Sequence, residues 1–283
     1  MRDRLIAWIL PYVGETLAPI LIPDQPVLST LGGILGVIIA VLWARREGVL
    51  WWKALLVAGG AVLVALGMAR VFWAIIHYDY ILADPMIFLD PYKGGAVSFG
   101  ALFGATVGGV LTARILKAPM WRLADTSFPA SLVGIAFARV GCLMRACDYG
   151  VRSELPWAFR YPPTSSVWRR HLAEGWLGVA DPLSDPVHPF PLYLSVWAIA
   201  VFLLVWLKPR LFGVHPGQRA MGAGILWLAG RFVIEFLRQA GNAPMVLGPI
   251  NLGQALAVAG IVVFIGIHVS LGRRPAQEGT AAG

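Results

Sequence analysis

The chain has 283 residues, of which 58% are hydrophobic and only 13% are charged, and its net charge is +8. A soluble domain carries about 25% charged residues, so this composition excludes a water-exposed globular protein and predicts an all-α integral membrane protein with the lipid bilayer as its partner. No basic run with interleaved aromatic residues stands outside the expected membrane ends, and we therefore expect no nucleic-acid partner.

Seven stretches are apolar over most of the roughly 20 residues that a membrane crossing needs. In chain order, the predicted helices are Leu28–Trp43, Leu55–Ile76, Val97–Leu116, Phe128–Leu143, Leu192–Leu207, Met221–Leu237 and Leu252–Leu271. The glycines between Gly100 and Gly109 would allow close contact between helices in lipid. A single transmembrane domain over residues 1–272 accounts for the seven stretches.

The distribution of basic residues predicts the orientation. Lys and Arg follow the first, third, fifth and seventh stretches, whereas the connection after the second stretch is acidic. Cytoplasmic connections carry the excess of Lys and Arg, so we expect a periplasmic N-terminus and a cytoplasmic C-terminus in a bacterial inner membrane. Residues 1–26 would then form an arm on the outer surface, residues 145–191 a small periplasmic head, and residues 273–283 a disordered cytoplasmic tail.

Four ionisable residues lie inside the predicted helices, namely Arg70, Arg139, Arg231 and Glu235. Such groups are costly in lipid and are usually functional or paired. Arg231 and Glu235 share one helix face, so a purely structural ion pair is one interpretation. The interiors of the predicted helices nevertheless contain three arginines but only one or two carboxylates. At least one guanidinium group should therefore lack a buried acidic partner. A phosphate group suits the planar guanidinium fork, which predicts a site for an anionic lipid of the outer leaflet.

Five segments, which stand in order between about Val27 and Ile267, share a pattern with known proteins. They are Ala83-Asp84-Pro85 with Gly94-Gly95 and Gly100 to Gly104; Asp125 with the run from Ala138 to Gly150; His188-Pro189 with Leu192-Tyr193; Gly230-Arg231-Phe232 to Arg238; and Leu252-Gly253-Gln254. Taken together they resemble the bacterial prolipoprotein diacylglyceryl transferase family, of which this chain would be a divergent member.

The resemblance implies a reaction. In that family, an outer-leaflet phosphatidylglycerol gives its diacylglyceryl group to the lipobox cysteine thiol of a prolipoprotein, glycerol phosphate leaves, and no metal or organic cofactor is needed. Arg139 and Arg231 match the two important arginines of the family, and Glu235 matches their partner acid, so these three are the expected catalytic residues. The expected substrate contacts are Arg70, Gly94, Gly95, Gly100, Asp125, Cys142, Gly150, His188 and Tyr193.

The sequence departs from the family where proton transfer is concerned. The position of the family histidine is Phe99 by register, and no tyrosine stands near the first predicted helix. The proton acceptor could then be Glu235, Asp148 or His188. The alternative function is a catalytically altered or inactive paralogue that binds an anionic phospholipid. A small-solute transporter ranks last, because such folds usually show related halves and no internal repeat is visible.

The two cysteines stand five residues apart. Cys142 holds a position that the family often fills with Asn, and Cys147 follows at the expected helix end. We expect a structural role for them, because two cysteines alone make a poor zinc site. The outer location permits a disulfide, but this spacing is awkward for a regular helix.

Overall fold

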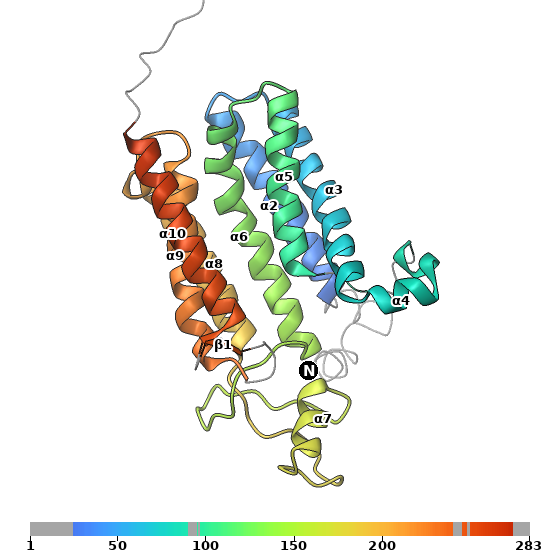
Figure 1. Ribbon diagram of the computed structural model, residues 1–283. Coiled ribbons are helices and arrows are strands. Elements are labelled where there is room, and N and C mark those ends of the chain that lie inside the picture. The colour runs from blue at the N-terminus through green and yellow to red at the C-terminus, as the bar shows by residue number, and fades with distance from the viewer. Residues whose placement is uncertain (1–24, 90–94, 96, 240–244, 248–249, 274–283) are drawn as a thin grey trace, which may run out of the picture. The chain divides into compact units, whose positions relative to one another are not determined.

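The computed structural model describes the chain except for residues 1–24, 90–94, 96, 240–244, 248–249 and 274–283 (Figure 1). The predicted outer-surface arm and cytoplasmic tail therefore lie almost entirely outside the described residues. The elements are α2 (Gln25–Arg46), α3 (Trp51–Ile76), α4 (Tyr78–Ala83), η1 (Pro85–Phe88), α5 (Ser98–Ile115), α6 (Met120–Arg145), α7 (Ser166–Ala173), α8 (Phe190–Leu207), η2 (Pro209–Phe212), α9 (Gln218–Ile234), η3 (Glu235–Leu237), β1 (Met245–Leu247), β2 (Ile250–Asn251) and α10 (Leu252–Gly272).

Each of the seven predicted spans coincides with a helix. Over the described residues, six are long and apolar enough to cross a membrane, namely α2, α3, α6, α8, α9 extended by η3, and α10. The remaining one, α5, is apolar over the shorter stretch Gly100–Ile115. The mostly helical membrane architecture is therefore confirmed, whereas the seventh crossing and the periplasmic side of the head stay predictions.

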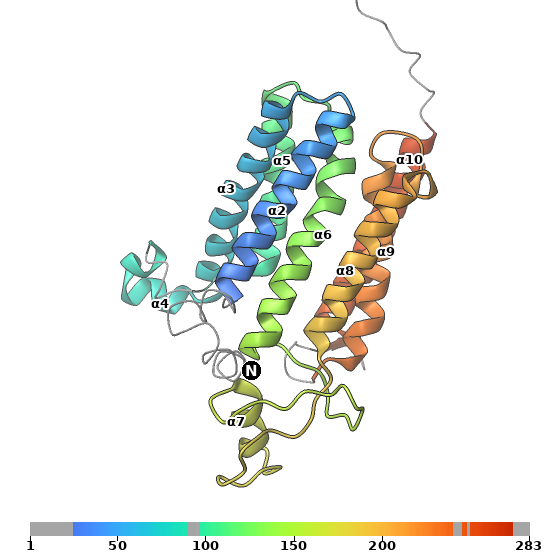
Figure 2. The same cartoon turned by 180° about the vertical axis from the view of Figure 1, so that it is seen from behind.

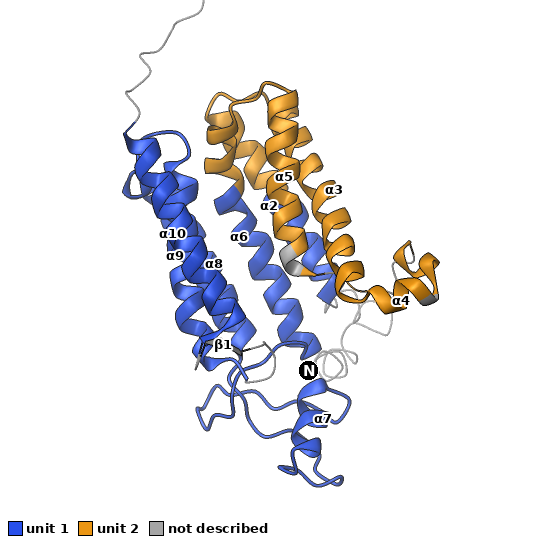
Figure 3. Cartoon of the chain, viewed as in Figure 1, with its two compact units in different colours: residues 1–36, 128–283 blue, residues 37–127 orange. Residues whose placement is uncertain are grey.

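The helices group into two compact units, which Figure 3 colours separately. Unit 1 contains residues 1–36 and 128–283, and unit 2 contains residues 37–127. The long helices α2 and α6 each contribute one part to either unit.

Unit 2 is built on close packing of α5 against α3. Gly100, Gly104 and Gly108 stand four residues apart on one face of α5, and a Cβ atom at any of them would lie under 3.0 Å from a backbone carbonyl oxygen of α3. Only glycine permits this approach, which is how small residues bring helices together in lipid. The expected contact through the glycine-rich stretch is thus confirmed.

Unit 1 contains a bundle of α8, α9 and α10, which run side by side in both views (Figures 1 and 2). The indole nitrogen of Trp197 on α8 donates to the carbonyl oxygen of Trp227 on α9 at 3.3 Å. The hydroxyl of Ser195 on α8 donates to the carbonyl oxygen of Ala136 on α6 at 3.0 Å. The second contact joins α6 to the bundle within this unit, which matters because charged residues of the candidate site come from both.

The predicted head is the segment of the chain that connects α6 to α8, and it contains α7 (Figure 1). Its small core consists of Ala146, Tyr149, Tyr161, Val167 and Val187. Backbone bridges join Val187 to Arg152 and to Phe159, and a further bridge joins Gly150 to Arg238 at the end of α9. The head is therefore held to the helix bundle by its backbone, not only by side chains.

Candidate functional site

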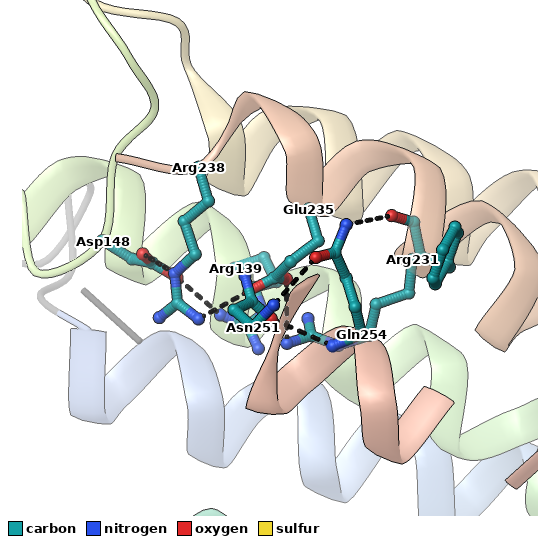
Figure 4. A network of polar contacts seen from close by, with 8 residues as sticks. Arg139, Asp148, Arg231, Glu235, Arg238, Asn251 and Gln254 are labelled. Carbon is teal, nitrogen blue, oxygen red and sulfur yellow. Dashed lines mark hydrogen bonds and ion pairs between the residues drawn. The ribbon is translucent and has the colours of Figure 1, made fainter. Parts of the chain in front are cut away.

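A network of charged and amide side chains lies in unit 1, where α6, the head, the end of α9 and the start of α10 meet (Figure 4). Its labelled members are Arg139, Asp148, Arg231, Glu235, Arg238, Asn251 and Gln254. Residues that are far apart in the sequence are thus joined in one charge cluster.

Asp148 and Arg238 are the link between the two halves of the network. Asp148 accepts from Arg139 Nη1 through Oδ2 at 3.3 Å and from Arg238 Nε through Oδ1 at 3.1 Å. Arg238 also donates through Nη1 to Glu235 Oε1 at 2.8 Å. One carboxylate thus joins two guanidinium groups, and one guanidinium group joins two carboxylates.

Besides Arg238, two further side chains contact the carboxylate of Glu235. Arg231 lies one helical turn before it, and Arg231 Nη2 is 3.2 Å from Glu235 Oε2, although the pair is not aligned as a hydrogen bond. The Asn251 side-chain amide donates to Glu235 Oε1 at 3.3 Å. At this point α9 tightens into the 3₁₀ turn η3, which begins at Glu235.

The start of α10 supplies the amide groups of the network. Asn251 caps α10: its side chain accepts from the backbone N–H of Gln254 at 2.9 Å, and Gln254 Oε1 accepts from the backbone N–H of Asn251 at 3.1 Å. This reciprocal capping box fixes both side chains. Gly253 leaves room for the arrangement, because a Cβ atom there would lie 3.2 Å from Glu235 Oε1.

Gly150 allows the head to approach the end of α9. Its backbone N–H donates to His188 O at 3.1 Å, and it forms the bridge to Arg238. A Cβ atom at this position would lie 2.5 Å from Leu237 O and 2.7 Å from His188 Cβ. Glycine is therefore required for the approach that brings Arg238 to Asp148.

The positive groups are the accessible part of the network. The side chains of Arg139, Arg231 and Arg238 are 28%, 21% and 19% exposed, whereas those of Asp148 and Glu235 are 9% and 1% exposed. Three guanidinium groups against two carboxylates leave a net charge of +1. Buried carboxylates thus hold the arginines while the arginine side chains stay partly exposed, which is an arrangement that can bind an anion such as a phosphate.

Burial raises the pKa of Asp148, and the nearby Arg238 and Arg139 only partly oppose this rise. The carboxyl group therefore takes up a proton at a higher pH than an exposed aspartate does. Because only the ionised form can hold two guanidinium groups, the geometry of Arg139 and Arg238 depends on pH.

The three residues expected to be catalytic, Arg139, Arg231 and Glu235, lie together in this network (Figure 4). At least one of Arg70, Arg139 and Arg231 is expected to lack a buried acidic partner, and of these Arg139 and Arg231 each have one. Arg139 is paired with Asp148, which follows the end of α6 and was not counted among the carboxylates of the spans. The excess positive charge comes instead from Arg238, which follows η3.

Four expected substrate contacts also belong to unit 1. Gly150 shapes the network as described, and Cys142 lies one turn after Arg139 on α6 as a free thiol. His188 Nδ1 is 3.0 Å from the hydroxyl of Tyr193, which accepts from Trp157 Nε1 at 2.9 Å. His188 and Tyr193 thus form a hydrogen-bonded pair at the beginning of α8.

The other expected contacts belong to unit 2 or lie outside the described residues. Arg70 donates to the carbonyl oxygens of Phe88 at 2.9 Å and Gly95 at 3.1 Å, and also to that of Ile87. It thereby ties the segment that follows α4 to α3. Gly100 packs against α3, and Asp125 is buried on α6. Gly94 lies outside the described residues, and the substrate contacts of this whole group stay predictions.

Four members of the network, namely Asp148, Arg238, Asn251 and Gln254, were not among the expected catalytic residues or substrate contacts, but each had a signal. Arg238 stands three residues after Glu235, a spacing that places both on one helix face. Asn251 with Gln254 has the spacing of a capping box. Asp148 lies within the run from Ala138 to Gly150 and was considered only as a proton acceptor. Over the described residues, no group of three or more His, Cys, Asp or Glu side chains converges as metal ligands.

Comparison with known proteins gives a consistent result. Residues 34–270 match the model of the family described as "Prolipoprotein diacylglyceryl transferase". A protein of Clostridioides difficile (strain 630) is 27% identical over 263 residues, covering 93% of this chain and 96% of its own length. Proteins of Nostoc sp. and Chloroflexus aggregans are each 28% identical and cover 71% and 87% of this chain and 68% and 84% of their own lengths. All three carry the name "Phosphatidylglycerol--prolipoprotein diacylglyceryl transferase".

Proposed function

Because this chain belongs to the prolipoprotein diacylglyceryl transferase family, we propose that it moves the diacylglyceryl group of phosphatidylglycerol to the lipobox cysteine thiol of a prolipoprotein. The reaction takes place at the outer leaflet of a bacterial inner membrane. The observation that supports this most is the network in which Arg139, Arg231 and Arg238 are partly exposed and their two carboxylate partners are buried.

The guanidinium groups suit the leaving group of this reaction. The thiolate sulfur of the lipobox cysteine attacks the glyceryl carbon, a C–S bond forms, and the C–O bond to phosphate breaks. Glycerol phosphate leaves with the bonding electrons, so negative charge grows on the phosphate oxygens. Arg139 and Arg231 provide N–H donors at fixed positions, and such preorganised charge is usually the largest contribution to catalysis. Asp148, Glu235 and Arg238 act as positioning residues.

The hydrogen bonds of the three candidate proton acceptors favour His188. Asp148 already accepts hydrogen bonds from two arginines, and Glu235 accepts them from Arg238 and Asn251. A proton on either carboxylate would cost ion pairs. Among the described residues, the ring of His188 uses only Nδ1 in a hydrogen bond, which leaves Nε2 for the proton of the incoming thiol.

A variant tests the assignment to His188. We expect His188→Gln to lower the rate of transfer strongly at neutral pH and to recover part of it as the pH approaches the thiol's own pKa of about 8.5, because the substrate then ionises without help. The measurement is the pH profile of kcat with a lipobox peptide. A variant with the wild-type rate at neutral pH would move the role to another group.

Membrane placement follows from the charge pattern. In the proposed orientation the N-terminus and the head face the periplasm, α5 is the seventh crossing, and the C-terminus is cytoplasmic. The charge network, at the head end of α6 and α9, then lies at the level of the outer-leaflet headgroups, where the phosphate of phosphatidylglycerol also lies.

The function is tested with the full chain in vesicles that contain phosphatidylglycerol. A synthetic lipobox peptide is added, and its mass is measured. We expect the peptide to gain a diacylglyceryl thioether, and we expect expression of the chain to rescue cells depleted of their own transferase. Unmodified peptide and no rescue, alongside an active family member under the same conditions, would contradict the proposal.

A second candidate is a paralogue that binds an anionic phospholipid without transfer, and the phenylalanine at position 99 favours it. Phe99→His separates the two. A protein that only binds lipid keeps its affinity for phosphatidylglycerol and still makes no product, whereas a transferase already makes product with Phe99 in place.

A further inference from the structure

The two cysteines lie at a turn that ends α6. Ala146 adopts a left-handed conformation with φ of 58°. The backbone N–H of Cys147 donates to Cys142 O at 3.3 Å, and that of Ala146 donates to Leu143 O at 3.3 Å. These two bonds, from the sixth residue to the first and from the fifth to the second, define a Schellman motif.

This motif changes what the spacing of five residues means. In a regular helix, residues five apart are separated by about 7.5 Å along the axis, which makes a disulfide between them awkward. In a Schellman motif the chain turns back, and the side chains at the first and sixth positions commonly touch. Those two positions are occupied by Cys142 and Cys147.

The side chains agree with the backbone. Both cysteines are free, Cys142 is half-buried, and Cys147 is exposed. Cys147 Sγ lies 3.7 Å from Cys142 O. A hydrogen bond with Cys142 raises the pKa of the Cys147 thiol. The thiols are therefore neighbours, and one of them is open to a reagent from the outer phase.

We propose that Cys142 and Cys147 are a redox modification site, which forms a reversible intramolecular disulfide on reaction with an external disulfide. The S–S bond forms between Cys142 and Cys147 as each thiol gives up one proton and one electron. The external disulfide takes the two electrons and two protons and becomes two thiols. The exposed Cys147 first forms a mixed disulfide with the external reagent, and Cys142 then attacks Cys147 Sγ and releases the second thiol.

The disulfide bears on the charge network as well, a consequence that rests on the proposed function. Asp148 directly follows Cys147 and holds Arg139 and Arg238. A covalent link between Cys147 and α6 limits the positions that Asp148 can take. The oxidised protein therefore restricts Asp148, and with it the two guanidinium groups, more than the reduced protein does, and we expect it to be the faster enzyme.

The test uses the full chain in detergent micelles, equilibrated in glutathione buffers of increasing oxidised fraction. Acid quenching, alkylation and intact-mass measurement count the remaining thiols. We expect two alkylated cysteines at the reduced end and none at the oxidised end, in a single two-electron step that leaves the protein monomeric. Cys142→Ser should take up glutathione as a mixed disulfide at Cys147.

Variants at residue 146 test the role of the turn. A β-branched side chain strongly disfavours a positive φ, so Ala146→Val should require at least a tenfold more oxidising glutathione ratio than wild type. Ala146→Gly is the matched control and should oxidise at least as readily as wild type. Two thiols that persist in oxidised glutathione, disulfide-linked dimers, or an Ala146→Gly variant that resists oxidation would each overturn the proposal. None of these readouts needs transferase activity, so a chain that makes no lipidated peptide but oxidises as described contradicts only the proposed function.

Discussion

Replacement of Asp148 by asparagine removes one negative charge from the network while almost preserving the shape of the side chain. Two ion pairs are lost, to Arg139 at 3.3 Å and to Arg238 at 3.1 Å. Each attraction amounts to about 4 kcal/mol at the effective dielectric constant near a protein surface, but returning the carboxylate to water recovers several kcal/mol. Because burial outweighs the attraction of the two arginines and raises the pKa of Asp148, the free energy of unfolding should change little. We expect the loss, about 1 to 3 kcal/mol, in the activation free energy of transfer.

The loss should appear mainly in the rate of transfer. Arg139 and Arg238 lose the group that fixes them, and about 1.4 kcal/mol in the activation free energy corresponds to tenfold in rate. We therefore expect Asp148→Asn to lower kcat by about tenfold to a hundredfold, with a smaller change in KM. The assay is mass-spectrometric detection of the lipidated peptide, with thermal unfolding in detergent as the measure of stability.

A matched control is available in the head. Asp185 pairs with Arg152 at 3.3 Å, but these side chains are 29% and 50% exposed. Such surface pairs contribute about 0 to 1 kcal/mol, so Asp185→Asn should leave both the melting temperature and kcat nearly unchanged. Equal effects of the two substitutions would show that loss of any head carboxylate suffices, and the reasoning about the network would then be wrong.

The pH profile gives a readout that a general loss of stability does not change. Since burial raises the pKa of Asp148, acidification protonates it above the usual aspartate pKa of about 3.9 and releases the arginines. The wild-type rate should therefore fall as the pH drops through this raised pKa, and Asp148→Asn should lack that fall. For stability the sign is opposite: a raised folded-state pKa favours the protonated folded form, so this contribution is present at low pH and is lost as the pH rises through the folded-state pKa.

Three further substitutions test other parts of the molecule. Arg139→Lys should lose at least tenfold in kcat without a large change in melting temperature, because lysine keeps the charge but lacks the two-pronged guanidinium geometry; a fully active variant would show that charge alone suffices. Gly150→Ala should lower the melting temperature and kcat together, because its Cβ would lie 2.5 Å from Leu237 O, whereas the open position Gly178 tolerates alanine in the same assays. The pKa of His171 is lowered by burial, and neither ring nitrogen has a hydrogen-bond partner among the described residues. The unfolded chain therefore binds the proton more readily, and wild-type stability, measured by thermal unfolding, should fall as the pH drops below about 6.5. His171→Phe should flatten that dependence, and an unchanged slope would place the titrating group elsewhere.

Hydropathy and local spacing predict the helices and the ion pair between residues that are close in the sequence. Arg231 and Glu235 are four residues apart on one helix, so the side chains meet wherever that helix is placed. The beginning of α6 was set eight residues too late, at Phe128 instead of Met120. Arg122 and Asp125 lower the apolar character of the first turns, although Asp125 is buried in the structure.

Contacts that depend on the path of the chain could not be predicted in this way. Arg238 and Asp148 are 90 positions apart, and their ion pair forms only because the head folds back to place Gly150 beside Arg238. Asp148 lies outside the predicted spans, so the pairing of Arg139 with it could not be predicted from the residues inside them. The predicted positive net charge of the cluster is unaffected. Gly150 is part of the run that resembles the family, but the sequence does not show why glycine is needed there. The structure shows that the backbone approach is too close for a Cβ atom.

The source of the carboxylates explains how a site can be both charged and open in lipid. Glu235 is held by α9 and the start of α10, whereas Asp148 is held by the turn that leaves α6. If both carboxylates were on the membrane helices, they would pair with the arginines whatever position the head took. With Asp148 on the turn, the position of Arg139 depends on the backbone bridge between Gly150 and Arg238. Substitutions that loosen this bridge should therefore displace Arg139 as well as destabilise the head, so that kcat and the melting temperature fall together.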